Sequence, residues 1–290
     1  MKGIILAGGN GTRLYPLTAT VSKQLLPVYD KPMICYPLGT LMLLGIRDIL
    51  IISKKSDHEA IRNFLGNGSQ LGISISYEIQ NKPNGIAEAF ILAEDFIENK
   101  PVCLILGDNI FHFVSKPVQI KPSENFTGAK IIGYHVGNPE NFGVLELDQN
   151  KNVISLIEKP KNPKSSYAAV GLYFYDNSVV EKSKTLKKSP RGELEITDLN
   201  NKYLTEGKLK CDLLSRGSLW ADAGTVNSLN LISNYIHSIE KLQNLKISCL
   251  EEIAYREGYI EKKDFKKLAK IYSVNTDYRN YLEQILYEQK

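Results

Sequence analysis

Short apolar runs alternate with longer segments of helical periodicity along most of this chain. The alternation is typical of βαβ units, in which helices join parallel strands and cover the faces of their sheet. It therefore predicts an α/β fold with a mostly parallel central sheet flanked by helices. The expected strands are 4–7, 48–53, 73–79, 102–107, 130–136, 153–158 and 168–175. The expected helices are 36–45, 58–65, 86–94, 194–206 and 228–242.

The C-terminal end differs from the rest of the chain. From Asn244 onward the sequence is richer in Lys, Glu and Tyr, has helical spacing and contains no strand-like run. We therefore expect a core over 1–242 and a small helical appendage over 243–290. With 290 residues, 43% of them hydrophobic and 23% charged, the chain can bury one large core or two modest ones.

Charge and cysteine usage indicate a cytoplasmic protein without nucleic-acid or membrane partners. The net charge is only +4, and the local lysine cluster alternates with Phe265 and Leu268, as on the solvated face of a helix. The cysteines lie far apart, which predicts free thiols in a reducing compartment. We find neither a signal-peptide pattern nor an apolar segment of membrane length. The lysines are Lys262, Lys263, Lys266 and Lys267, and the cysteines are Cys35, Cys103, Cys211 and Cys249.

A glycine-rich loop, AGGNGTR, follows the first expected strand. It lacks the dinucleotide-binding pattern, because the third glycine position holds Leu14, and it lacks the Lys and Ser/Thr of a P-loop. With these two motifs excluded, the functional interpretation that remains is a loop whose main-chain N–H groups and Arg13 bind phosphate. An ordinary turn with a surface arginine is the alternative.

Charged residues stand at the ends of several apolar runs, where open α/β sheets bind their ligands. Asp108 and Asn109 follow VCLILG, and Asp222 follows the only tryptophan. Two such carboxylates can share Mg²⁺ beside a phosphate. The alternatives are that Asp108 caps a following helix and that Asp222 belongs to a turn.

Two further charged segments stand before expected turns. Glu158 and Lys159 precede Pro160, and both can line one pocket only if their strand has already ended there. Arg191 lies in SPRGELEITD, ahead of Glu193 and Glu195, which we interpret as acids favoured by the dipole of a first helical turn.

The inventory contains phosphate cations and separated carboxylates, but no nucleophile with a partnered base. The four histidines, His58, His112, His135 and His237, are scattered. Such an inventory suits phosphoryl or nucleotidyl transfer by direct displacement, because positioning and charge neutralisation provide most of the catalysis.

Two strings, GIILAGGNGTRLYPLT and SKQLLPVYDKPMICYPL, resemble the signature of the sugar-1-phosphate nucleotidyltransferases. LGDNIF, GLYFYD, RGELEITDLN and EEIAYREG narrow the resemblance to the branch that makes dTDP-glucose from dTTP and glucose 1-phosphate, the first step of dTDP-sugar synthesis. The resemblance extends from residue 2 to about residue 258. It implies a Rossmann-like core, Mg²⁺ dependence and a homotetramer.

The resemblance also implies roles for matching residues. Arg13, Lys159 and Asp108 would be catalytic: Arg13 stabilises the leaving pyrophosphate, and Lys159 holds the sugar phosphate. The metal ligands would be Asp108 and Asp222. Nucleotide contacts are expected from Gly8, Gly11, Thr12, Arg13, Lys23, Gln80 and Gly85. Sugar-phosphate contacts are expected from Asn109, Gly143, Glu158, Lys159, Val170 and Arg191.

The chain departs from the family pattern at three places. Phe142 and Ala223 each lack a hydroxyl that the family commonly carries there, and the 112–122 segment lacks its Y-G-H string and contains two prolines. In relatives the region of the 112–122 segment helps to form a second, regulatory nucleotide site, so we expect weak or absent feedback inhibition. Another sugar 1-phosphate, UTP as donor, and a catalytically silent nucleotide-binding regulatory subunit are the alternative functions.

Overall fold

The computed structural model describes residues 1–123 and 125–288. Four parallel strands form one side of its main sheet, in the order β5, β4, β1, β6, with β5 at the edge. The apolar runs of β1, β4 and β6 are buried on both faces, as is usual where helices cover a parallel sheet. The bounds are β1 Lys2–Ala7, β4 Asp48–Ser53, β5 Ser74–Ile79 and β6 Val102–Leu106.

Antiparallel strands extend this sheet beyond β6. β11 (Tyr167–Tyr175) pairs with β6 through its second half and with β9 through its first half. The register of β11 against β8 shifts between Val170 and Tyr173, which bends the strand at Gly171. The other antiparallel strands are β8 Ala129–His135, β9 Gly143–Leu147 and β10 Val153–Glu158, and β12 (Leu209–Leu213) pairs in parallel with β8.

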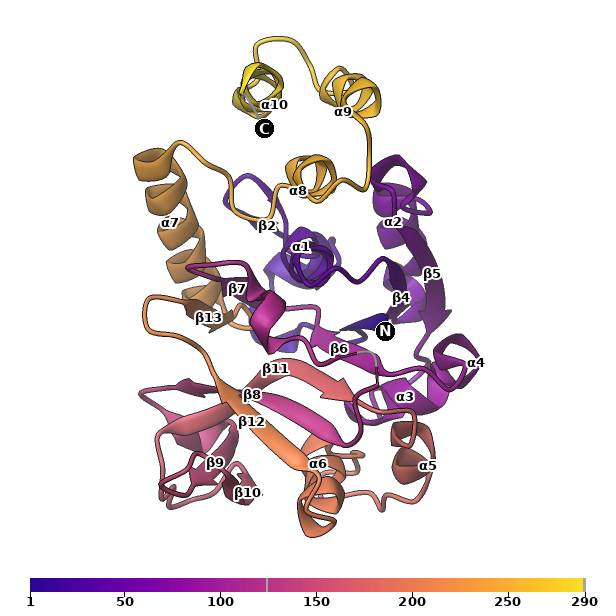
Figure 1. Ribbon diagram of the computed structural model, residues 1–290, viewed down its shortest axis with the longest axis vertical. Coiled ribbons are helices and arrows are strands. Elements are labelled where there is room, and N and C mark those ends of the chain that lie inside the picture. The colour runs from indigo at the N-terminus through magenta and orange to yellow at the C-terminus, as the bar shows by residue number, and fades with distance from the viewer. Residues whose placement is uncertain (124, 289–290) are drawn as a thin grey trace.

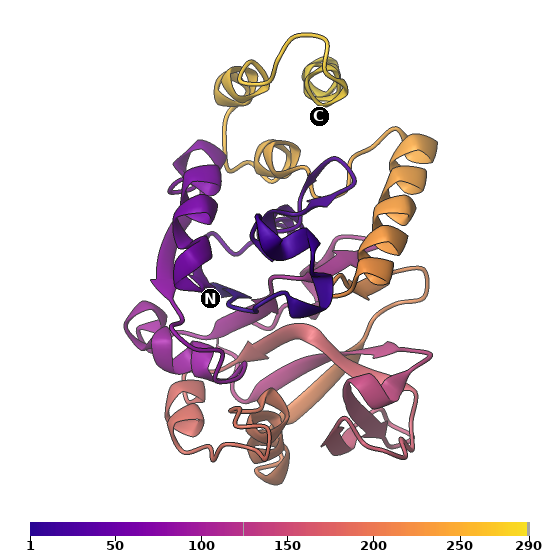
Figure 2. The ribbon, with the colours of Figure 1, turned by 180° about the vertical axis from the view of Figure 1, so that it is seen from behind.

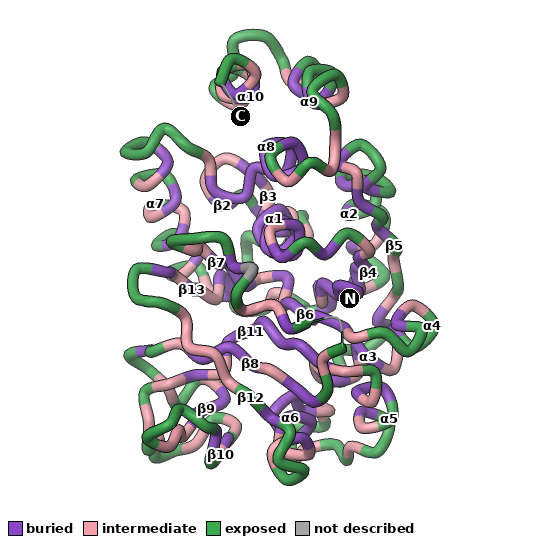
Figure 3. Tube along the Cα trace, in the orientation of Figure 1, coloured by how far each residue is buried: buried purple, intermediate pink, exposed green. Residues whose placement is uncertain are grey.

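Helices cover both faces of the sheet, so the α/β prediction is confirmed (Figures 1 and 2). Neighbouring residues of β1 pack on opposite faces of the sheet. Ile5 belongs to the hydrophobic cluster that includes residues of α1, α2 and α8, and Ile4 belongs to the cluster that includes residues of α3 to α6. Buried residues accordingly lie mostly along the strands, and exposed residues lie mostly on the outer helices and loops (Figure 3). The helices are α1 Cys35–Leu43, α2 Lys55–Leu65, α3 Glu88–Leu92, α4 Glu94–Ile97, α5 Val179–Lys184, α6 Ile196–Thr205 and α8 Leu250–Arg256.

Two small sheets and a long helix lie beside the main sheet. β2 (Pro27–Val28) and β3 (Lys31–Pro32) form a hairpin that packs against α7 (Val226–Gln243). β7 (Asn109–His112) pairs with β13 (Leu219–Asp222) in antiparallel register. Short 3-10 helices lie at Thr12–Leu14, Leu17–Ala19, Lys23–Leu25, Ser69–Leu71, Pro117–Ile120 and Pro139–Asn141.

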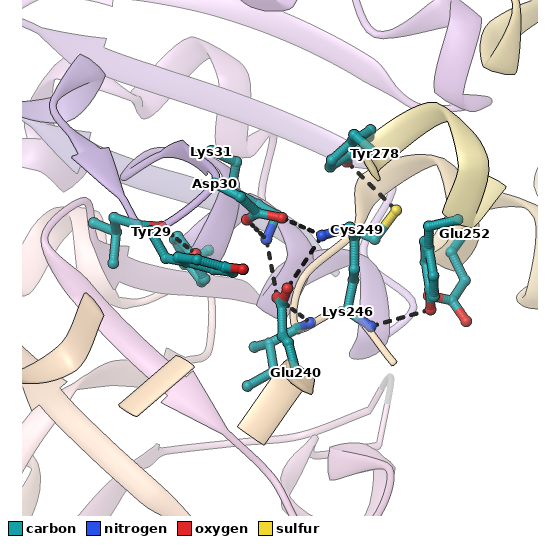
Figure 4. A network of polar contacts seen from close by, with 12 residues as sticks. Tyr29, Asp30, Lys31, Glu240, Lys246, Cys249, Glu252 and Tyr278 are labelled. Atoms are coloured by element: carbon teal, nitrogen blue, oxygen red, sulfur yellow. Dashed lines mark hydrogen bonds and ion pairs between the residues drawn. The ribbon is translucent and has the colours of Figure 1, made fainter. Parts of the chain in front are cut away.

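After α7 the described chain continues as α8, α9 (Lys262–Ala269) and α10 (Asp277–Tyr287), which share an apolar cluster. A buried ion network ties this region to the hairpin (Figure 4). Lys246 bonds to Asp30 and lies 3.2 Å from Glu240, while Lys31 lies 3.3 Å from Glu240. Although burial acts to raise it, the lysines hold the pKa of Asp30 below its ordinary value of 3.8.

Several elements differ from the sequence-based expectations. The helix predicted over 86–94 is divided at Ala93 into α3 and α4. It begins only at Glu88, because the main chain before it docks against Leu194, with Ala87 N donating to Leu194 O at 3.2 Å. The helix predicted from 194 begins at Ile196. Within the 112–122 segment, His112 ends β7, and the residues after it form only a short 3-10 helix, in keeping with their prolines. The four cysteines are free, and none of the helices in the described residues has the length and hydropathy to cross a bilayer.

Candidate active site

The carboxyl ends of the four parallel strands meet at one edge of the sheet. Ala7 pairs with Ser53, Ser53 with Ile79, and Leu6 with Leu106, so the residues that follow these strands lie in one row. Gly8, Gln80 and Asp108 therefore lie along the same edge although they are far apart in sequence. This is where open α/β sheets bind ligands.

The glycine loop after β1 passes close to other parts of this edge. Gly11 has φ of +65°, and Thr18 Oγ1 donates to its carbonyl oxygen at 3.0 Å. The loop then carries Arg13, whose side chain is 63% exposed and reaches to 3.6 Å from Asp222 Oδ2. An exposed cation thus lies between the loop and a carboxylate at the sheet edge.

The pairing of β7 with β13 brings Asp108 and Asp222 together. Asp222 lies opposite Asn109 in this ladder, and Ala223 N donates to Asp108 O at 2.9 Å. Burial and the neighbouring Asp108 raise the pKa of Asp222 above its ordinary value of 3.8, despite the opposing effect of Lys23 and Arg13. The expected juxtaposition of the two acids is present, and the alternative that Asp108 caps a helix is wrong because β7 follows it.

Lys23 forms an ion pair with Asp108. Its side chain is only 8% exposed, so the ammonium is directed at the carboxylate from inside the protein. Burial acts to raise the pKa of Asp108, but Lys23 and a hydrogen bond from Asn109 outweigh it, and the pKa lies below 3.8. The resemblance assigns Lys23 to the nucleotide phosphates, whereas here its immediate partner is a metal-ligand candidate.

The buried Asn109 amide is also engaged with protein groups. Its Nδ2 donates to Asp108 Oδ1 at 3.0 Å, while its Oδ1 accepts from Trp220 Nε1 at 2.6 Å and from Gly171 N at 3.1 Å. Trp220 therefore sets the orientation in which Asn109 supports the Asp108 carboxylate. Gly171 is required here, since an added Cβ would lie 2.4 Å from Asn109 Oδ1.

A cavity of about 1180 Å³ opens beside the two acids. Arg13, Asp108 and Asp222 line it together with Glu158 and Lys159. Lys159 directly follows β10 and has φ of +43°, which allows it to share the cavity with its neighbour. Further lining residues are Asn138, Asn141, Phe142, Gly143, Gly171, Tyr173, Trp220, Ser228 and Tyr235.

Glu158 is held by residues on the α6 side of the cavity. Thr197 Oγ1 donates to Glu158 Oε2 at 2.6 Å, and Arg191 lies 3.2 Å from Glu158 Oε1. Arg191 also makes two hydrogen bonds to Glu195, which is the residue before α6. Glu195 therefore acts as an ion-pair partner, in addition to any effect on the helix dipole. The sequence analysis did not single out Thr197, although it lies in the quoted RGELEITD string.

The expected base-contact residues lie at the β5 end of the edge. An added Cβ on Gly8 would be 2.0 Å from Gln80 Oε1, so glycine permits this close approach. Gly85 has φ of +110° and lies against Leu194, with an added Cβ only 2.4 Å from Leu194 O. Gly85 thus has a structural reason to be glycine that is independent of any base contact.

Val170, one of the expected sugar-phosphate residues, does not point its side chain into the cavity. Val170 is fully buried in the hydrophobic core, whereas Ala169, Gly171 and Tyr173 on the same strand line the cavity. Because side chains alternate along a strand, Val170 points to the opposite face. The expected contact of Val170 with the sugar phosphate would therefore have to come from its main chain.

The Asp108–Asp222 pair fits a hard divalent cation, which prefers oxygen ligands and is often bound by one or two carboxylates plus substrate phosphates. The described residues contain no group of three or more His, Cys, Asp or Glu arranged to hold a metal ion. The remaining ligands would therefore be substrate oxygens or water.

Comparison with known proteins shows the family of this chain. The family model described as "Nucleotidyl transferase" matches residues 2–238. The chain is 53% identical to a glucose-1-phosphate thymidylyltransferase of Neisseria gonorrhoeae and 49% identical to one of Mycolicibacterium smegmatis, over 99% of both chains in each case. These similarities confirm the resemblance noted in the sequence strings.

Solved structures show the same fold. A Bacillus anthracis structure, described as a candidate glucose-1-phosphate thymidylyltransferase in complex with a sucrose, matches with a TM-score of 0.75 and 46% identity. The match covers 81% of this chain and 94% of that one. A UDP-glucose pyrophosphorylase complexed with UDP-glucose matches with a TM-score of 0.71 at 22% identity, covering 82% and 98%, and supports the fold alone.

Proposed function

Because this chain belongs to the nucleotidyl transferase family, we propose that it transfers a deoxythymidylyl group from dTTP to glucose 1-phosphate. The products are dTDP-glucose and pyrophosphate, so the reaction is the first step of dTDP-sugar synthesis. The observation that carries the proposal is the acid pair beside Arg13, at the rim of a cavity that Glu158 and Lys159 also line.

The proposed chemistry is one in-line displacement. A phosphate oxygen of glucose 1-phosphate attacks the α-phosphorus of dTTP, a new P–O bond forms, and the bond to the β-phosphate oxygen breaks. The departing electron pair leaves with pyrophosphate. No general base is needed, because the attacking phosphate oxygen is already ionised at neutral pH.

We assign one charged group of the cavity to the leaving pyrophosphate and two to the attacking sugar phosphate. Arg13, whose side chain is exposed, stabilises negative charge on the pyrophosphate side. Lys159 holds the sugar phosphate for attack, and Glu158, oriented by Thr197 and Arg191, accepts hydrogen bonds from sugar hydroxyls. Catalysis then comes from positioning the two substrates, and no side chain acts as a nucleophile or as a general base.

Asp108 and Asp222 would hold the divalent cation, which we propose is Mg²⁺. When bound, it supplies charge neutralisation for the triphosphate oxygens. Lys23 and Asn109 keep the Asp108 carboxylate ionised and oriented toward that position. The two-carboxylate donor set and its place beside the glycine loop support this assignment.

We also propose contacts and assembly that follow from the family. Gly8, Gly11 and Thr12 would wrap the triphosphate, and Gln80 and Gly85 would receive the base. Residues 1–242 would form the catalytic core and 243–290 an appendage, whose helices share an apolar cluster of their own while α8 also packs into the main core. A homotetramer is expected, and light scattering after gel filtration measures it.

Pyrophosphate release tests the proposed function. The purified chain is incubated with Mg²⁺, dTTP or UTP, and a panel of sugar 1-phosphates, and we expect the greatest kcat/KM with dTTP and glucose 1-phosphate. Binding of dTTP without pyrophosphate release from any pair would refute catalysis and would indicate a silent nucleotide-binding subunit. A preference for a purine nucleotide would refute the base assignment.

A further inference from the structure

A chain of polar side chains leads inward from the surface to Gln80 at the end of β5. Lys188 Nζ donates to Asn84 Oδ1 at 3.1 Å, and Asn84 Nδ2 donates to Glu88 Oε1 at 2.7 Å. Gln80 Nε2 donates to the other oxygen, Glu88 Oε2, also at 2.7 Å. The Gln80 residue is 4% exposed, so its amide has little freedom to exchange these partners for water.

The charged groups of this network, Lys188 and Glu88, determine the direction of every hydrogen bond in it. An ammonium only donates, so the Asn84 oxygen must face Lys188 and the Asn84 NH2 group must face Glu88. An ionised carboxylate only accepts, so the NH2 group of Gln80 must also face Glu88. The Gln80 oxygen then faces the glycine loop, within reach of a Cβ placed on Gly8.

We propose that Glu88 is a specificity-determining positioning residue, which holds the Gln80 amide in the orientation that accepts thymine or uracil and rejects cytosine. This inference rests on the proposed function, in which the base lies against Gln80. To the residues expected to contact the base, the inference adds Glu88, which would act on the base only through Gln80.

The reason lies in the order of donors and acceptors on the pyrimidine edge. Thymine and uracil present an N3–H donor beside the O4 acceptor, which match the amide oxygen and the free N–H of Gln80. Cytosine presents an N3 acceptor beside the N4 amino donor, and the same contact then needs the amide turned over. Turning it over places Gln80 Oε1 against the Glu88 carboxylate and loses an N–H···O⁻ bond.

Glu88→Gln tests the inference because it keeps the shape of the side chain but replaces the carboxylate, which only accepts hydrogen bonds, by an amide. The new amide can donate or accept, so Gln80 can adopt either orientation. We expect the ratio of kcat/KM for dTTP over dCTP to fall roughly 10- to 100-fold, the range of one hydrogen bond to a charged group. The dTTP over UTP ratio should stay unchanged, because both bases present the same edge.

Binding provides a readout that is independent of turnover. Calorimetric Kd values for dTDP and dCDP should converge in Glu88→Gln by the same factor as the kinetic ratio. Glu94→Gln is the matched control: it removes the same charge from a partly exposed carboxylate paired with Lys184, and it should leave both ratios unchanged. Asn84→Ala removes one of the two donors to Glu88 and should reduce the dTTP over dCTP ratio by a smaller factor.

The outcomes separate this inference from the proposed function. A wild-type protein that does not prefer dTTP over dCTP, or releases no pyrophosphate, refutes the proposed function. A wild-type preference for dTTP that persists unchanged in Glu88→Gln refutes the role of Glu88 alone. Equal weakening of dTDP and dCDP binding also refutes it, since that result indicates a purely structural contact. If Glu88→Gln does not fold, an unchanged ratio in Asn84→Ala refutes the inference.

Discussion

Replacing Lys23 by Met should destabilise the free protein in a way that a second mutation reverses. Lys23 and Asp108 form an ion pair in which their side chains are 8% and 19% exposed. Lys23→Met keeps most of the aliphatic length but leaves the Asp108 carboxylate without its cation. The double variant Lys23→Met/Asp108→Asn removes both charges.

The expected size follows from the burial of the pair. Breaking a buried ion pair by removing one partner costs about 3–5 kcal/mol, because the other charge remains desolvated. Asp108 keeps its hydrogen bond from Asn109 and some contact with solvent, so we expect the lower end, about 3 kcal/mol. For a chain of this size that corresponds to a fall in Tm of roughly 5–10 °C.

Thermal unfolding followed by circular dichroism, with and without MgCl₂, measures the effect. Lys23→Met should melt well below wild type, the double variant should recover most of the loss, and Mg²⁺ should raise the Tm of Lys23→Met more than that of wild type. Lys208→Met, which breaks an exposed pair with Glu206, is the control and should change stability by no more than about 1 kcal/mol. The reasoning is refuted if Lys23→Met melts within about 2 °C of wild type, or if the double variant melts as low as the single one.

Four further predictions follow. Trp220→Phe keeps an aromatic ring but loses the N–H donated to Asn109, so Mn²⁺ affinity measured by electron paramagnetic resonance should fall about 10-fold; unchanged affinity would contradict this link. Asp222→Asn should lower kcat roughly 100-fold or more at saturating Mg²⁺ with little change in Tm, and equal turnover would remove Asp222 from the site. Asp30→Asn should cost about 1–3 kcal/mol at pH 7. Because the pKa of Asp30 is depressed on folding, this deficit should fade in denaturant titrations as the pH falls below 3.8, and a deficit that persists in acid would argue against the ion network. Inhibition by dTDP-rhamnose at a second site should be weak or absent, given the irregular 112–122 segment; non-competitive inhibition against dTTP with two nucleotides bound per chain would show the reverse.

Local periodicity was sufficient to predict most of the secondary structure. The strand expected over 48–53 has the bounds observed for β4, and that over 153–158 has the bounds of β10. Both runs are short, apolar and bounded by turn residues, so nearby sequence decides their conformation. The helix expected over 86–94 was wrong as one piece, since it is divided at Ala93, and wrong at its start. The main chain before α3 docks against Leu194, about a hundred residues away, which no local pattern contains.

The sequence by itself determined which residue types are available to the site: a glycine loop with Arg13, acids at strand ends, and no partnered nucleophile. Only the tertiary structure decided which of them meet. Asp108 and Asp222 come together through the β7–β13 ladder, and Lys23 faces the first of these acids from inside the protein. The physical reason is that ion pairing and amide orientation depend on distances of a few ångströms between segments far apart in sequence, and long-range packing sets those distances.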